Sequence, residues 1–65
     1  MVYLIKVKES YVLSSGLWTK FTLFKEDAKR FPDRKTANDA VEELFDPSFY
    51  RNFDRHDVEV VPYTI

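Results

Sequence analysis

One segment of the chain carries an apolar stripe that only a second layer of structure can cover. Five residues recur at the spacing of one helical face: Ala37, Ala40, Val41, Leu44 and Phe45. Asp33 is a natural N-cap for this helix, with Thr36 and Asp39 as a competing cap pair, and Asp46-Pro47 ends it. The sequence therefore predicts one amphipathic helix, which requires a sheet to pack against.

Alternating apolar and polar residues supply that sheet. Over residues 2–8, Tyr3, Ile5 and Val7 lie on one side of a half-buried strand, and Lys6 and Lys8 lie on the other. Residues 11–13 either continue this strand or form a second short one. The only glycine of the chain lies in the segment 14–16 between two apolar runs, which predicts a hairpin turn there.

Two further strands are predicted on either side of the helix. Residues 17–24 alternate, with apolar and aromatic side chains on both faces. The charged segment 25–30 predicts a helical turn or an irregular crossing, and Phe31 anchors its end in the core. Residues 58–65 return as a strand, and Pro62 makes it an edge strand or frays its pairing.

These elements predict a single compact α+β domain over residues 1–65. A three- to four-stranded, mainly antiparallel sheet carries one amphipathic helix across one face, in the order β-β-(β)-α-β. The 65 residues include no cysteine, which excludes disulfides and a thiol nucleophile. With no apolar run near the roughly 18 residues of a membrane span and no leader pattern, a soluble cytoplasmic protein is expected.

Several short segments follow one another in a fixed layout: Tyr-Leu-Ile-Lys-Val at 3–7, Tyr-Val-Leu at 11–13, Phe-Thr at 21–22, Ala-Lys-Arg-Phe at 28–31, the alanines at 37 and 40, and Val-Glu-Val at 58–60. This layout resembles that of small uncharacterised proteins of bacteriophages and prophages. This chain departs from the simpler pattern by an insertion over 46–55. The resemblance implies a small accessory protein that binds and inhibits a host or defence factor, and it assigns no site residues.

Charge is divided unevenly between the two halves of the chain. Residues 1–36 hold eight Lys or Arg against four acids, whereas residues 37–65 hold two Arg against seven acids. This asymmetry indicates either a surface that steers a partner or simple attraction between a basic sheet and an acidic helix.

No set of residues predicts catalysis or a cofactor. The single histidine, His56, has Asp54 and Asp57 nearby, but three polar residues on one loop favour solvation over a metal site. None of the serines lies in a nucleophile-elbow sequence, and no glycine-rich phosphate loop is present. We therefore expect no enzyme activity and no cofactor.

The aromatic content favours protein binding. One Trp, four Tyr and six Phe exceed what one small core hides. The periodicity assigns Phe21, Phe31, Phe45 and either Phe49 or Phe53 to the core. It leaves five residues partly exposed, namely Trp18, Phe24, Tyr50, Tyr63 and Tyr11. The best anchors are Trp18 and the segment Phe49, Tyr50 and Arg51, unless these aromatics cover the second face of the sheet or a homodimer interface.

The sequence thus favours a small factor that blocks a host or defence protein sterically; it disfavours nucleic acid as a partner, and no membrane partner is expected. The alternative is a nucleic-acid-associated protein that uses Lys6, Lys8 and Lys20 with Trp18 and Tyr3 on a basic sheet face. A further alternative is a DNA mimic that uses the acidic helix side formed by Asp39, Glu42, Glu43 and Asp46.

Overall fold

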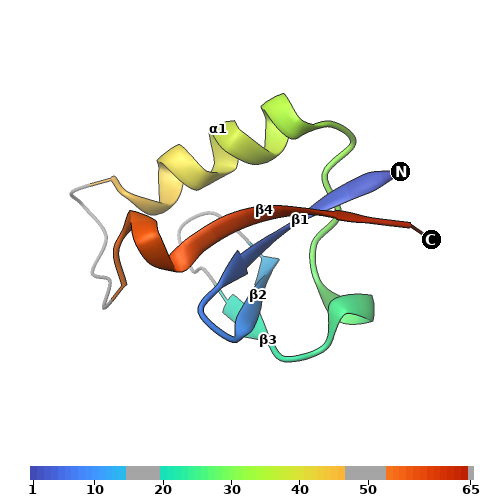
Figure 1. Cartoon of the computed structure of the whole chain (residues 1–65), viewed down its shortest axis with the longest axis horizontal. Coiled ribbons are helices and arrows are strands. Elements are labelled where there is room, and N and C mark those ends of the chain that lie inside the picture. Colours follow the sequence, from blue (N-terminus) through green and yellow to red (C-terminus); the bar gives the residue numbers. More distant parts are fainter. Residues whose placement is uncertain (15–19, 47–52, 65) are drawn as a thin grey trace.

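The computed structural model describes residues 1–14, 20–46 and 53–64, and these form a sheet with one helix on it (Figure 1). The strands pair antiparallel in the order β3-β2-β1-β4, which confirms the predicted fold class. The elements in chain order are β1 (Val2–Val7), β2 (Ser10–Ser14), β3 (Lys20–Thr22), the 3-10 helix η1 (Lys25–Asp27), α1 (Arg34–Leu44), the 3-10 helix η2 (Arg55–Asp57) and β4 (Val58–Tyr63).

β1 and β2 form a tight hairpin, so residues 11–13 belong to a second strand. Val7 pairs with Ser10, which leaves Lys8 and Glu9 as the turn. Lys8 has a φ of 57°, in the left-handed region that favours glycine. The turn therefore places a lysine at the first loop position of a hairpin, where glycine is ordinarily preferred.

β3 is shorter than the strand predicted over residues 17–24. It pairs with β2 only through Lys20–Thr22, and the register shifts between Val12 and Ser14. The strand stops because the Thr22 hydroxyl accepts the Phe24 N–H at 3.2 Å, which turns the backbone toward η1. β2 and β3 pair as a hairpin requires, but the predicted turn at Ser15 and Gly16 lies outside the described residues.

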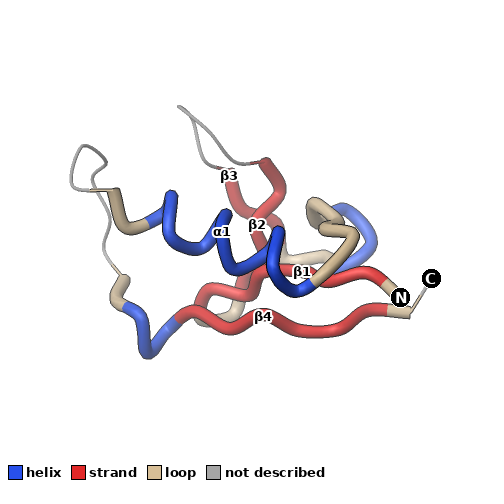
Figure 2. The backbone as a smooth tube through the Cα atoms, turned by 90° about the horizontal axis from the view of Figure 1, so that it is seen from above, coloured by secondary structure: helices blue, strands red, loops and turns tan. Residues whose placement is uncertain are grey.

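β4 pairs with β1 along its whole length and is an edge strand, so of the two alternatives that Pro62 left open, the edge strand is found and the frayed pairing is not. Figure 2 shows β3 and β4 at opposite edges of the sheet. Val2 of β1 pairs with Tyr63 of β4, so the two ends of the described chain lie close together.

One core lies between the sheet and α1. Its buried residues are Ile5, Val7, Val12, Phe31, Ala37, Ala40 and Leu44. The helix begins where Asp33 predicted, because the Asp33 carboxylate accepts the Thr36 N–H at 2.7 Å. Phe53 contacts both Phe21 and Phe45 edge-on, with ring centroids 6.1 and 5.7 Å apart, and so extends this core toward β3.

A second, smaller core on the opposite face corrects the prediction that β1 is half-buried. Leu4 is completely buried there with Tyr11 and Ala28, and Val61 and Tyr63 pack against them. Tyr11 is therefore a core residue rather than an exposed aromatic. Phe21, which the periodicity assigned to the core, is instead 42% exposed because α1 packs over β1 and β4 and does not cover β3.

The segment that crosses from η1 to α1 holds both cores together. Its Lys29 N–H donates to the Val12 carbonyl at 2.8 Å. Tyr3 and Phe31 then exchange two backbone hydrogen bonds of 2.9 and 2.8 Å, on the side of β1 away from β4. In the same segment, Ala28 is buried in the smaller core on one face of the sheet and Phe31 in the core under α1 on the other.

We expect Lys8→Gly to stabilise the protein by about 1 kcal/mol, because glycine adopts the left-handed conformation of this turn without a Cβ penalty. The matched variant Glu9→Gly, at the turn position without positive φ, is expected to lower stability by about 0.5–1 kcal/mol. Urea unfolding of both variants measures the difference. Equal effects of the two substitutions would contradict the assigned turn geometry.

Candidate functional site

The acidic and histidine residues before β4 form a structural turn. Asp54 and Asp57 cap η2 reciprocally: the Asp54 side chain accepts the His56 N–H at 3.0 Å, and the Asp57 carboxylate accepts the Asp54 N–H at 3.1 Å. The segment predicted as a polar loop therefore contains a capped 3-10 turn, and Asp54, Arg55 and His56 are exposed. Within residues 1–14, 20–46 and 53–64, no group of three His, Asp or Glu side chains is arranged to hold a metal ion.

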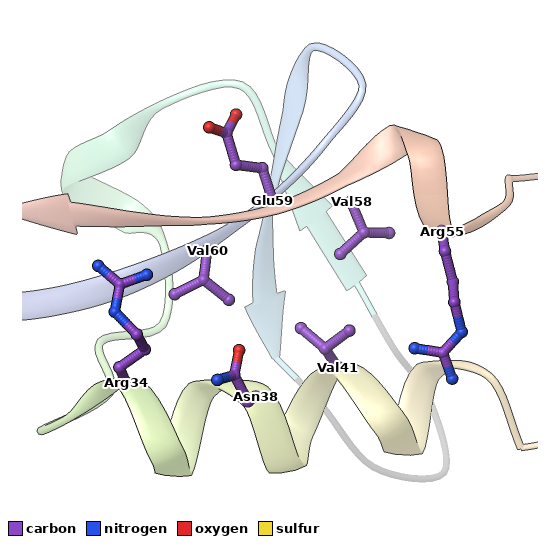
Figure 3. A pocket seen from close by; sticks show the side chains of 7 residues that line it. All are labelled: Arg34, Asn38, Val41, Arg55, Val58, Glu59 and Val60. Atoms are coloured by element: carbon purple, nitrogen blue, oxygen red, sulfur yellow. The ribbon is translucent and has the colours of Figure 1, made fainter.

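A groove of about 470 Å³ runs between α1 and the edge strand β4 (Figure 3). Its lining residues are Arg34, Asn38, Val41, Arg55, Val58, Glu59 and Val60. The helix contributes Arg34, Asn38 and Val41 because these positions follow one stripe at i, i+4 and i+7. The groove therefore has a valine floor and polar residues along its rim.

Arg55 closes one end of this groove. Its guanidinium forms a bidentate pair with the Glu42 carboxylate at 2.9 and 2.8 Å and lies 4.7 Å from the centre of the Phe45 ring. Hydrogen bonding and attraction between the two charges lower the pKa of Glu42 and raise the pKa of Arg55. Both side chains are more than half exposed, so the pair orients Arg55 more than it stabilises the fold.

Arg34 lies at the other end of the groove with a free charge. Its guanidinium lies 5.0 Å from the centre of the Tyr3 ring, a cation–π contact. Among the described residues, no carboxylate pairs with Arg34. The Asp33 cap fixes the first turn of α1 and thereby the position of Arg34.

A second surface of interest lies around β3 on the opposite edge of the sheet. Leu23 is 69% exposed and Phe24 is 60% exposed, immediately after the strand. Phe21 precedes them and borders a hollow of about 170 Å³ that it shares with Phe53 and the β1–β2 turn. We call Phe21, Leu23 and Phe24 the β3 apolar surface. The exposure of Phe24 was predicted, whereas Leu23 was missed because strand alternation alone does not reveal which face the helix leaves uncovered.

The structure does not describe the protein-binding anchors predicted from the sequence. Trp18, Phe49, Tyr50 and Arg51 all lie outside the described residues. Their role as anchors stays a prediction.

The lysines of the alternative nucleic-acid face are not joined by Tyr3. Lys6 lies on the side of β1 opposite Tyr3, between Tyr11 and Glu59 in the register, so a carboxylate accompanies it. Lys8 lies in the turn, and Lys20 begins β3. The predicted grouping of Tyr3 with Lys6 is therefore wrong, because Tyr3 packs on the helix side of the sheet.

The acidic helix side is exposed as predicted. Asp39, Glu42, Glu43 and Asp46 are all exposed, and Glu42 is engaged by Arg55. Sequence reasoning missed the groove itself, since nothing in the chain signals that η2 and α1 approach each other. The stripe of Arg34, Asn38 and Val41 was the available signal for its helical wall.

Comparison of the chain with protein-family models, with curated proteins and with solved structures finds no match in any of the three. None of the helices in the described ranges is both long and apolar enough to cross a membrane.

The cap at the start of α1 makes stability depend on pH. The Thr36 N–H, which donates to the Asp33 carboxylate, lowers the pKa of Asp33 below its ordinary value of 3.8. This contribution to folding is fully present above the unfolded pKa and is lost as the pH falls through the folded pKa.

We expect Asp33→Asn to keep the cap, because an amide oxygen also accepts the Thr36 N–H, and to reduce the fall in thermal midpoint between about pH 5 and pH 3. Asp39→Asn, which removes a carboxylate from the exposed side of the same helix, is the matched control. Thermal unfolding of both variants, followed by circular dichroism over this pH range, measures the fall in thermal midpoint. An undiminished acid sensitivity in Asp33→Asn would contradict the assignment.

Proposed function

We propose that this protein is a small binding factor that acts by occupying the surface of another protein. The observation that carries the proposal is the β3 apolar surface, where Leu23 and Phe24 are 69% and 60% exposed. Small soluble proteins seldom hold two adjacent large apolar side chains in water without a partner to cover them. The resemblance to phage accessory proteins suggests a host or defence protein as this partner.

The backbone beneath the two side chains supports the same proposal. The Phe24 N–H donates to the Thr22 hydroxyl, and the Phe24 carbonyl accepts the Asp27 N–H at 3.1 Å. Ala28, four residues later, is buried in the second core. Leu23 and Phe24 are thus presented from an anchored turn, which reduces the conformational entropy lost when a partner covers them.

The edge strand β3 lies directly beside Leu23 and Phe24. An apolar pair flanked by an edge strand and by the charged residues Lys25, Glu26 and Asp27 matches the general arrangement of an interface, with an apolar centre and a polar rim. A partner seated there is blocked from its own substrates or assemblies by steric exclusion alone. No catalytic group is needed for such inhibition.

The nucleic-acid alternative has less support than protein binding. Glu59 lies directly across from Lys6 in the β1–β4 register, which weakens the positive potential that a phosphate backbone requires.

The double variant Leu23→Thr, Phe24→Thr is expected to weaken partner binding at least about tenfold, because truncating central apolar anchors removes about 2 kcal/mol or more. Stability is expected to change by less than about 0.5 kcal/mol, since both side chains are exposed. The measurement is quantitative capture of the partner from a lysate of the source cell by immobilised protein, followed by a titration with the purified partner.

The matched control is Lys35→Thr, Asp39→Thr, two exposed positions on the far side of α1. This pair is expected to retain wild-type capture. Sedimentation over a concentration series tests whether the β3 apolar surface is instead a homodimer interface. If the wild-type protein dimerises and the Leu23, Phe24 variant does not, the partner is a second copy of the chain. Unchanged capture by the folded double variant would refute the β3 apolar surface as the binding site.

A further inference from the structure

The groove on the opposite edge of the molecule is a second binding surface. We propose that the groove between α1 and β4 receives an extended peptide segment of a partner, which pairs with β4 as an added antiparallel strand and carries an acidic side chain to Arg34. This inference does not depend on the β3 apolar surface, because the two surfaces lie at opposite edges of the sheet.

The backbone of β4 offers the hydrogen-bonding groups that strand addition needs. The backbone N–H of Lys8 donates to the Asp57 carbonyl at 2.8 Å, whereas the backbone of Tyr3 bonds to that of Phe31 on the side of β1 away from β4. With the β1–β4 register, this alternation directs the backbone groups of Val58, Val60 and Pro62 away from β1. They form the free edge of the sheet beside α1.

Of these three residues of β4, only one offers both a free backbone N–H donor and a carbonyl acceptor. The Val58 N–H already bonds to the Arg55 carbonyl, and Pro62 has no N–H. The outward N–H of Val60 has no bond among the described residues. Val60 is therefore the residue that exchanges two hydrogen bonds with the incoming strand, and the carbonyls of Val58 and Pro62 accept one each.

The floor of the groove selects apolar side chains on alternate positions of the peptide. Val41, Val58 and Val60 are each only partly buried, and Figure 3 shows all three directed into the space between α1 and β4. Since side chains of a strand alternate, every second residue of the incoming segment faces this floor. Small β-branched residues fit a surface made of valines.

The charge of Arg34 determines that the peptide carries an acidic side chain and where along the peptide that side chain lies. Arg55 is already occupied by Glu42, whereas Arg34 has no carboxylate among the described residues. The Glu59 side chain is directed away from α1 in Figure 3, and no ion pair joins it to Arg34 among the described residues. Arg34 lies at the end beyond Val60, toward the C-terminal end of β4, so an antiparallel segment places its acidic residue before its apolar ones.

A capped synthetic peptide, acetyl-Asp-Thr-Val-Thr-Val-Thr-Gln-amide, tests the proposal. Its Asp and both Val side chains face the same side of a strand. The control peptide carries Lys in place of Asp. Titration into isotopically labelled protein, followed by amide chemical shifts and amide exchange, is expected to show protection of the Val60 N–H and shifts at Asn38 and Val41, with the Lys peptide about threefold to fivefold weaker.

Two variants separate the backbone from the charge. Val60→Pro removes the outward N–H without removing a bond to β1 and is expected to abolish binding, whereas Val60→Thr keeps the N–H and is expected to bind. Arg34→Gln is expected to bind both peptides equally. Because Arg34 is exposed, this variant keeps the test valid even if Val60→Pro does not fold.

Three results would overturn the proposal. The first is that the aspartate peptide causes no protection at Val60, and the second is that wild-type protein binds the aspartate and lysine peptides equally. The third is peptide-induced shifts confined to the β3 edge, which would assign strand addition to the other side of the sheet. Loss of partner capture by the Leu23, Phe24 variant bears only on the β3 apolar surface, so the two proposals fail separately.

Discussion

The fold depends on burying β1 on both of its faces. Leu4 and Ile5 are consecutive residues that point to opposite sides of the sheet, yet both are completely buried. Ile5 is covered by α1, and Leu4 is covered by Tyr11 and the crossing segment at Ala28. A chain of 65 residues without disulfides has a small apolar core, so two shallow cores that share one strand bury more apolar area than a single half-covered sheet.

The uncovered surfaces follow from where the covering elements end. Because α1 lies over β1 and β4, the outer strand β3 keeps Phe21 and the following Leu23 and Phe24 in solvent. Between α1 and β4, a groove with Val41, Val58 and Val60 in its lining stays open, with Arg34 and Arg55 at its two ends. The β3 edge of the molecule is thus apolar, which suits burial against a partner. The β4 edge is polar and, within the part of the chain that the structure describes, has unpaired backbone groups, which suits the addition of a strand.

Local patterns predicted most of the elements but not how they cover one another. Asp33 and the alanine stripe located α1, and Pro62 narrowed β4 to an edge strand or a frayed one, because capping and backbone donors are local properties. The burial of Leu4 depends on Ala28, and the bridge between Tyr3 and Phe31 joins distant segments, so neither appears in any short window of sequence. Lys8 in the turn was missed because the sequence offered glycine elsewhere. The exposure of Leu23 and the groove likewise depend on the placement of α1.

The pairing of β1 with β4 also determines when the sheet can form as the chain is synthesised. β1 is synthesised well before its full-length neighbour Val58–Tyr63, so until β4 emerges one edge of β1 and the Val41 side of α1 remain uncovered. Closing a loop of this length costs entropy before any contact repays it. A nascent chain in which β4 has not yet emerged is therefore expected to be a ready substrate for chaperones and proteases.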